Sequence, residues 1–185
     1  KTSTNIIRMK GQKMDGSIQV YYGNGRGKTT AALGLGIRAA GVGKQVIMVQ
    51  FLKKKHSDTL DFLKKLEPEL QIFRFEKAAC GYSDLSPKEK QEQMLNIKNA
   101  LGYSRKVLDT GQCDLLILDE IFGLVDYNII TIEELMDLIA VKKDSMDLIL
   151  TGRNLPDEVR EIADCVYSIQ REKEKTPEIL AQGNF

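Results

Sequence analysis

The sequence predicts an α/β protein in which helices cover both faces of a mostly parallel β-sheet. Apolar strand segments alternate with helical segments along most of the chain, a pattern typical of βαβ units. These strand segments are nearly continuous apolar runs, as expected for strands that are buried on both faces. A glycine-rich run at residues 22–30, YGNGRGKTT, separates the first strand segment from the first helical one.

The strand predictions depend on short runs of β-branched and aliphatic residues bounded by polar or glycine-containing segments. Ligands of parallel α/β sheets bind beyond the carboxyl ends of the strands, so the loops that follow these runs are where we expect a site. The predicted strands cover residues 17–22, 44–51, 70–75, 114–120, 147–152 and 165–170.

The helix predictions depend on apolar periodicity and on signals at the helix ends. Ser86 can cap a long helix, with Glu89 completing a capping box. The same Thr-x-x-Glu pattern opens a helix after Thr131. The predicted helices cover residues 29–40, 59–66, 87–109 and a segment that begins after residue 131.

Composition and charge are those of an ordinary water-soluble protein. Of its 185 residues 42% are hydrophobic and 29% charged, and the net charge is +1. This balance gives no electrostatic reason to expect nucleic acid or a membrane as a partner, and the lysine run at residues 53–55 is interpreted as a solvated face. No apolar run reaches the roughly 20 residues of a membrane span. We expect one domain over residues 17–185, preceded by a polar arm, residues 1–16, that is expected to be flexible.

Cysteine and histidine usage narrows the chemistry. Cys80, Cys113 and Cys165 are far apart in the sequence and odd in number, so they form neither a zinc motif nor a disulfide framework. Together with a polar N-terminus that lacks a signal-peptide core, they predict a reducing, cytoplasmic location. His56 is the only histidine, so neither a histidine-rich metal site nor a Ser-His-Asp triad is expected.

The glycine-rich run has the context of a phosphate-binding loop, because it follows a strand and opens a helix. Its glycines permit close approach of the backbone to a ligand, and the helix N-terminus favours an anion. Lys28 is placed to reach a phosphate, and the Thr29 hydroxyl to ligate Mg²⁺. The usual pattern G-x-x-x-x-G-K-[ST] has a glycine where this chain has Tyr22, so we expect a different path for the phosphates.

A second motif agrees with the loop. The apolar run at residues 115–118 delivers Asp119 and Glu120 at its carboxyl end, where a P-loop fold holds a carboxylate near Mg²⁺. An apolar strand that ends in Asp-Glu is weak evidence alone and strong evidence beside the loop. The sequence therefore predicts the P-loop NTPase (RecA-like) fold and binding of a nucleoside triphosphate with Mg²⁺.

With these motifs the chain resembles the P-loop ATP:corrinoid adenosyltransferases, the cobalamin adenosyltransferases of vitamin B12 metabolism. The loop of that family reads GNGKGKTT, which matches residues 23–30 with Arg26 in place of the first lysine. The resemblance covers most of residues 18–172. Three further segments match in order, namely VQFLK at 49–53, DLLILDE at 114–120 and ILTGRNLPDEVREIAD at 149–164.

The resemblance implies an enzyme in which a Co(I) corrinoid attacks the ribose 5′ carbon of ATP. A cobalt–carbon bond forms and triphosphate leaves, in the synthesis or salvage of adenosylcobalamin. Because Co(I) brings its own electron pair, the attack needs no general base, and the tasks of the protein are positioning and charge stabilisation. The resemblance also implies a homodimer and a reductase that supplies Co(I).

The motifs and the resemblance together name the candidate site residues. Lys28, Glu120 and Tyr82 are the catalytic candidates, and Thr29, Asp119 and Glu120 are expected to hold Mg²⁺ directly or through water. For Arg153 the alternative is a surface salt bridge, and for Asn24 a turn. Contacts with ATP are expected from Gly23, Asn24, Gly25, Arg26, Gly27, Lys28, Thr29, Thr30 and Arg153.

One segment departs from the family. After the third strand the family commonly has a Gly-Phe-Thr-Trp type segment, whose aromatic residues close over the corrinoid and help to detach its lower axial ligand. The corresponding run here is GYSD at residues 81–84, and the chain has no tryptophan. Tyr82 either supplies one aromatic face or packs in the core. The departure concerns corrinoid handling more than ATP binding.

Two other functions stay open from the sequence. In an ATPase or phosphotransferase, Glu120 would orient a water, and the product would be ADP rather than triphosphate. In a nucleotide- or corrinoid-binding module without turnover, which the missing tryptophan suggests, ligands would bind without formation of a cobalt–carbon bond.

Overall fold

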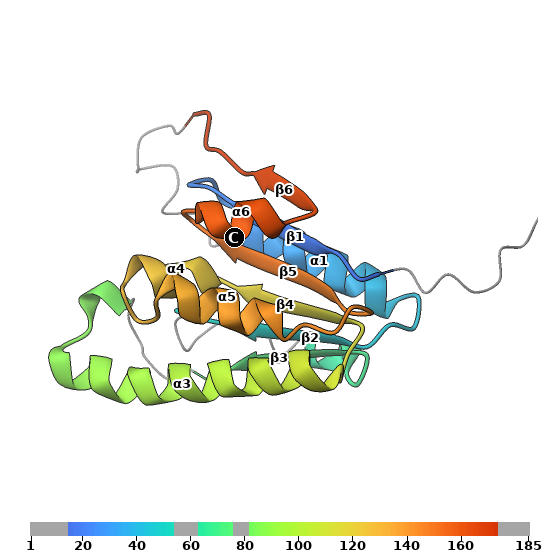
Figure 1. Cartoon of the computed structure of the whole chain (residues 1–185), viewed down its shortest axis with the longest axis horizontal. Helices are drawn as coiled ribbons and strands as arrows, with labels where there is room; N and C mark the ends of the chain where they lie inside the picture. The colour runs from blue at the N-terminus through green and yellow to red at the C-terminus, as the bar shows by residue number, and fades with distance from the viewer. Residues whose placement is uncertain (1–14, 54–62, 76–81, 174–185) are drawn as a thin grey trace, which may run out of the picture.

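The chain forms a central sheet with helices on both of its faces (Figure 1). Of the predicted helix at 59–66, only the end is described, as the 3-10 turn η1 (Lys64–Leu66). Gly81 and nearly all of the N-terminal arm lie outside the described residues. The computed structural model describes residues 15–53, 63–75 and 82–173.

The sheet has six described strands, and every pair of neighbours is parallel. Their spatial order is β3-β2-β4-β5-β1-β6, so all six carboxyl ends lie at one edge of the sheet. Each strand falls within one of the predicted segments. The strands are β1 (Ile18–Tyr22), β2 (Val46–Gln50), β3 (Leu70–Arg74), β4 (Leu115–Asp119), β5 (Asp147–Gly152) and β6 (Cys165–Ser168).

The two faces of the sheet bury separate apolar clusters. In β4, Leu115 and Ile117 pack in the cluster that contains α1, whereas Leu116 and Leu118 pack in the cluster that contains α3, α4, α5 and α6. This alternation follows from the two-residue period of a strand, and it confirms the prediction of helices on both faces. The helices are α1 (Lys28–Ala40), α3 (Pro87–Thr110), α4 (Ile121–Asp126), α5 (Ile132–Ala140) and α6 (Asp157–Ile162), with a 3-10 turn η2 (Tyr82–Asp84) before α3.

The predicted helix starts are confirmed where capping residues mark them. Ser86 with Glu89, and Thr131 with Glu134, form complete capping boxes at the starts of α3 and α5. Helices α4 and α6 were not predicted, because six residues are too few to show a helical period. Within the described ranges, no helix is both long and apolar enough to cross a membrane.

Candidate nucleotide-binding site

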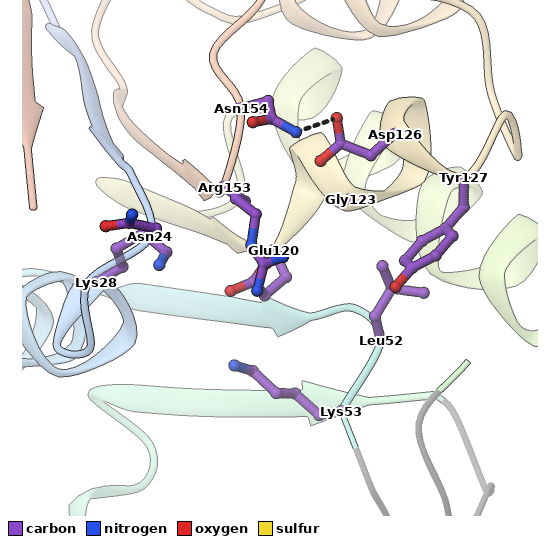
Figure 2. Close-up of a pocket in the computed structure, with 10 residues that line it drawn as sticks. All are labelled: Asn24, Lys28, Leu52, Lys53, Glu120, Gly123, Asp126, Tyr127, Arg153 and Asn154. Carbon is purple, nitrogen blue, oxygen red and sulfur yellow. Dashed lines mark hydrogen bonds between the residues drawn. The ribbon is translucent and has the colours of Figure 1, made fainter. Parts of the chain in front are cut away.

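A pocket of about 460 Å³ opens at the carboxyl edge of the sheet. Its wall comes from the segments that follow β1, β2, β4 and β5, which are among the loops where the sequence predicts a site. Asn24 and Lys28 lie on one side of the pocket, and Leu52 and Tyr127 lie on the opposite side (Figure 2). Among the described lining residues, the charged ones are Lys28, Lys53, Arg153, Glu120 and Asp126.

The backbone of the phosphate-binding loop requires glycine at both ends of the loop, at Gly23 and at Gly27. Gly23 and Gly27 have φ angles of 121° and 111°, in the left-handed region that side chains disfavour. A Cβ atom on Gly23 would also lie 2.3 Å from the carbonyl oxygen of Ile169. The Gly23 amide donates to the carbonyl oxygen of Arg153 at 3.0 Å, so the start of the loop is tied to the end of β5.

Tyr22 explains the unusual start of this loop. It is the last residue of β1, and the guanidinium group of Arg160 lies 5.3 Å from the centroid of its ring. Hydrogen bonds with Arg160 and Ser168 lower the pKa of Tyr22. The residue at the place of the usual first glycine is therefore part of the strand, and the loop begins at Gly23.

The segment that follows β6 is hydrogen-bonded to the loop. The Ile169 amide donates to the carbonyl oxygen of Tyr22 at 2.7 Å, and the Ile169 carbonyl accepts from the Gly25 amide at 2.9 Å. The amide of Arg171 donates to Oδ1 of Asn24 at 3.3 Å. Asn24 and Gly25 thus have partners within the protein, and their contacts with ATP stay predictions.

Lys28 turns back over the loop from the first turn of α1. Its ammonium group donates to the carbonyl oxygens of Gly23 at 2.7 Å and of Gly25 at 3.0 Å. Burial lowers the pKa of Lys28; the carboxylate of Glu120 raises it, and neighbouring cations, Lys53 first, lower it further. The ammonium group therefore lies within the loop, where an incoming phosphate would meet it.

Asp119 is fully buried at the end of β4. Its two carboxylate oxygens accept hydrogen bonds from the Thr29 hydroxyl at 3.0 Å, the Thr151 hydroxyl at 2.7 Å and the Gln50 amide at 3.0 Å. A buried carboxylate needs such partners, because desolvation without them is costly. The structure thus brings together Thr29 and Asp119, two of the three residues predicted to hold Mg²⁺.

Gln50 and Arg74 were missed by the sequence analysis. Nη2 of Arg74 donates to Oε1 of Gln50 at 2.6 Å, which leaves the Gln50 amide nitrogen to donate to Asp119. The three residues face one another in register across β3, β2 and β4. Each is a polar residue at the end of a largely apolar strand, and that is the sequence signal that was available.

Lys53 corrects the interpretation of the lysine run as a solvated face. Its side chain is only 29% exposed, and its ammonium nitrogen lies 3.5 Å from Oδ2 of Asp119. The same nitrogen donates to the Thr29 hydroxyl oxygen at 3.1 Å. The other two lysines of the run lie outside the described residues. Lys53 belongs to the pocket because it follows β2 at the carboxyl edge of the sheet.

Glu120 has a strained backbone, with a φ of 61°. A non-glycine residue in this region costs roughly 1–3 kcal/mol, and such residues concentrate at functional sites. The Glu120 amide donates to the Thr151 hydroxyl at 2.9 Å, and its side chain lines the pocket. The strain turns the chain from β4 directly into α4 and keeps Glu120 beside Lys28 and Arg153.

The site fits a magnesium ion that takes most of its ligands from phosphates and water. Thr29 offers a hydroxyl oxygen next to the carboxylate of Asp119, and hard oxygen donors suit this ion. In the part of the chain that the structure describes, no three His, Cys, Asp or Glu residues gather in a way that could hold a metal. Magnesium commonly binds through one or two protein oxygens plus substrate phosphates, and this donor set has that form.

Comparison with known proteins decides the family. The sequence profile described as "ATP:corrinoid adenosyltransferase BtuR/CobO/CobP" matches residues 14–182. The "Corrinoid adenosyltransferase" of Escherichia coli (strain K12) is 30% identical over 155 residues, which span 84% of this chain and 76% of that protein. The "Corrinoid adenosyltransferase CobA" of Salmonella typhimurium (strain LT2) is 30% identical over 159 residues, with 86% and 79% covered.

The chain belongs to the ATP:corrinoid adenosyltransferase family. Solved structures agree on the fold. The KaiC-like protein PH0186 of Pyrococcus horikoshii OT3 superposes with a TM-score of 0.58 at 19% identity, covering 87% of this chain and 75% of that one. The ATP synthase subunit NeqB, described from Nanoarcheaum equitans, gives a TM-score of 0.57 at 18% identity, covering 83% and 45%. The predicted P-loop NTPase fold is thereby confirmed.

The other side of the adenosyltransferase pocket is aromatic. Tyr127, at the end of α4, lines the pocket and is 48% exposed. The ring of Tyr82 lies 5.3 Å from that of Tyr127, and the Lys90 ammonium group lies 5.7 Å from the Tyr82 centroid. Tyr82 therefore reaches the pocket through Tyr127, which the sequence analysis missed because α4 was not predicted. We call Tyr82 and Tyr127 the aromatic end, and Lys28, Thr29 and Asp119 the phosphate end.

The remaining predicted residues of this family member surround the phosphate end. Arg153 lines the pocket after β5, next to Asn154, whose amide donates to Asp126 at 3.0 Å (Figure 2). Arg26 and Thr30 are exposed residues of the loop and of the first turn of α1. Their contacts with ATP stay predictions.

Proposed function

We propose that this adenosyltransferase moves the 5′-deoxyadenosyl group of ATP to the Co(I) centre of a corrinoid and releases triphosphate. The observation that carries the proposal is one pocket with a phosphate end and an aromatic end. Such a pocket can hold the triphosphate of ATP on one side and leave the opposite side for a large planar acceptor. Family membership supports both substrates.

The chemistry requires little from the side chains beyond positioning and charge. The cobalt electron pair forms the cobalt–carbon bond while the bond between C5′ and its oxygen breaks, and the bonding electrons leave with the triphosphate. Cobalt is formally oxidised from Co(I) to Co(III). The developing charge on the leaving oxygen is offset by preorganised cations and amides, which is an effective form of catalysis in a pocket of low dielectric.

Lys28 and the residues that surround the phosphate end have separate roles in this proposal. Lys28 exchanges its two carbonyl partners for phosphate oxygens, and Arg153 approaches the phosphates with its planar guanidinium group. Gly23, Gly25 and Gly27 supply backbone close to the phosphates, together with Arg26 and Thr30. Asn24 contacts phosphate or ribose.

Magnesium would be held at Thr29, Asp119 and Glu120, directly or through water, and would offset the charge of the triphosphate. The many hydrogen bonds already made by Asp119 support a contact through water for that residue, while Glu120 is half-buried and lines the pocket, where its carboxylate can reach a ligand. As a catalytic candidate, Glu120 would position the metal and its water ligands.

At the aromatic end, Tyr82 is proposed to act on the corrinoid together with Tyr127. The two tilted tyrosine rings offer apolar surface for contact with a planar macrocycle. We also infer a homodimer, a separate reductase that supplies Co(I), a cytoplasmic location, and one domain over residues 17–185 with a preceding arm. The homodimer and the reductase are supported by the family resemblance, and the location and the domain bounds by the sequence.

The decisive experiment is an anaerobic assay with ATP, Mg²⁺ and chemically reduced cob(I)alamin. We expect a light-sensitive alkylcobalamin in the corrinoid spectrum and triphosphate by phosphorus NMR. ADP with an unchanged corrinoid would instead identify an ATPase or phosphotransferase, in which Glu120 orients water. Tight binding of both ligands without any product would identify a binding module.

A further inference from the structure

Lys53 lies where its ammonium group contacts two of the three residues proposed to hold the metal, Thr29 and Asp119. The Thr29 hydroxyl oxygen is 3.0 Å and 3.1 Å from the two carboxylate oxygens of Asp119. A carboxylate can only accept, so the single Thr29 proton is donated to Asp119. The Thr29 oxygen then accepts from the Lys53 ammonium group, at 3.1 Å. That oxygen is also the ligand that Thr29 would offer to a metal ion.

The backbone is arranged to hold Lys53 in this position. Leu52 has a φ of 55°, in a region that a leucine rarely adopts. Its side chain packs against Gly123 of α4, where a Cβ atom would lie only 2.6 Å from Cδ1 of Leu52. The missing side chain at Gly123 thus gives Leu52 room, and this turn directs Lys53 back toward the phosphate end.

The two lysines at the phosphate end therefore have different partners. Lys28 is bonded to carbonyl oxygens of the loop, whereas Lys53 is the lysine within ion-pair distance of Asp119 among the described residues. A fully buried carboxylate is stabilised by a nearby cation. In this structure that cation is Lys53.

We propose that Lys53 is a positioning residue that takes the place of the metal ion until the metal and the nucleotide bind. Its ammonium group keeps Thr29 and Asp119 in their metal-binding arrangement, and it leaves the Thr29 oxygen when a divalent cation arrives. The triphosphate then provides the displaced ammonium group with a new anion. Metal and nucleotide binding are thereby coupled through one side chain. The inference rests on the magnesium part of the proposed function.

The test is a titration of the nucleotide-free protein with Mn²⁺, followed by electron paramagnetic resonance of the free ion. We expect Lys53→Met to bind Mn²⁺ tighter than the wild type by about tenfold or more, because a single positive charge a few ångströms from a divalent ion repels it by that order even when screened as in water. Lys53→Arg keeps the charge and is expected to stay within a few-fold of the wild type. ATP is expected to tighten Mn²⁺ binding more in the wild type than in Lys53→Met.

Lys143→Met is the matched control. Lys143 is 53% exposed and precedes β5, at the opposite edge of the sheet from the pocket, so this variant removes the same charge far from the metal site. Its Mn²⁺ affinity is expected to equal that of the wild type. Lys53→Gln repeats the loss of charge with a polar side chain, and thermal unfolding checks that each variant is folded.

Equal, weaker or undetectable Mn²⁺ binding by folded Lys53→Met and Lys53→Gln would overturn the inference. So would equal tightening by Lys143→Met, because the effect would then be one of net charge. The readout needs neither cobalt nor turnover. A wild-type protein that makes no triphosphate would therefore reject the proposed function without changing the Mn²⁺ result. Unchanged Mn²⁺ affinity in Lys53→Met would reject the role of Lys53 without changing the triphosphate result.

Discussion

At the phosphate end of the pocket, Asp119 accepts hydrogen bonds from β2, α1 and β5, whereas at the aromatic end Tyr127 and Tyr82 meet through one ring contact. The first arrangement is buried and joined to the central strands of the sheet. The second has Tyr127 directly after a six-residue helix and Tyr82 in a 3-10 turn. Groups with many buried partners move at a high free-energy cost, and exposed groups with few partners move cheaply.

This difference separates two tasks of the proposed reaction. The triphosphate is the same in every turnover and benefits from fixed, preorganised donors. The corrinoid is large, and its binding requires a surface that can adapt to it. We therefore expect substitutions at the phosphate end to reduce catalysis or stability, and substitutions at the aromatic end to change how the acceptor binds.

Lys28→Ala is expected to lower kcat/KM by about a hundredfold to a thousandfold, because it removes a preorganised cation from the leaving triphosphate. The fold should persist, since Lys28 bonds only to carbonyl groups of its own loop in the described structure. Steady-state kinetics and a thermal melt measure the two effects. Full activity in Lys28→Ala would mean that the assignment of the phosphate-binding loop is wrong.

Thr151→Val tests the hydrogen bonds beneath the phosphate end. The substitution leaves Oδ1 of Asp119 with one partner fewer and leaves the Glu120 amide without its hydroxyl acceptor. Loss of partners for buried polar groups is expected to lower the free energy of unfolding by about 1–3 kcal/mol, as measured by urea denaturation. Thr151→Ser keeps the hydroxyl and is the control. Equal free energies of unfolding for Thr151→Val and Thr151→Ser would mean that these hydrogen bonds do not stabilise the site.

Tyr127→Ala is expected to raise KM for the corrinoid by about tenfold, which corresponds to the loss of roughly 1.4 kcal/mol of aromatic contact. The Kd for ATP should stay within a factor of two to three. Tyr127→Phe keeps the ring and should behave like the wild type. Tyr82→Ala should follow the same pattern more weakly, since Tyr82 reaches the pocket through Tyr127. An equal loss of ATP and corrinoid binding would assign these tyrosines to packing.

Asp147 lies at the start of β5, far from both ends of the pocket, and Asp147→Asn tests the contribution of its charge to stability. Burial alone would raise the pKa of Asp147, but hydrogen bonds from Ser17 and Lys44 outweigh it, and the pKa is lowered. A lowered carboxylate pKa stabilises the fold at neutral pH, and that stability is lost as the pH falls through the pKa of the folded state. Asp147→Asn should therefore be less stable than the wild type at pH 7, within about 1 kcal/mol.

The difference between Asp147→Asn and the wild type should shrink as the pH is lowered through the acid range, and kcat/KM should not change. Denaturation at pH 7 and at acid pH measures the first point. A constant difference at all pH values would mean that the charge of Asp147 plays no part.

Much of the phosphate end could be predicted from the sequence, because its residues adjoin a recognisable loop and strand. Thr29 and Asp119 were expected to meet, because Asp119 ends one parallel strand, Thr29 comes shortly after another, and the carboxyl ends of both strands lie at the same edge of the sheet. Gln50 and Arg74 were not expected, because the sequence does not show which strands are neighbours or how they are in register. Lys53 was misjudged as a solvated lysine for the same reason.

The aromatic end could be predicted only in part. Tyr82 was identified from the resemblance, but Tyr127 directly follows a helix that is too short to show a helical period. The left-handed backbone of Leu52 and Glu120 has no sequence signal, because both residue types normally adopt other conformations. Their conformations follow from tertiary packing against Gly123 and from the hydrogen bond to Thr151.

The contact between the loop and the segment after β6 has a consequence for how the protein is made. The Arg171 amide and its Asn24 acceptor are 147 positions apart in the chain. A ribosome adds about 5–20 residues per second, so the loop leaves the exit tunnel well before the segment that holds it. The ATP site is therefore among the last parts of the described fold to be completed, and a nascent chain cut short before residue 169 carries the whole glycine motif without its finished geometry.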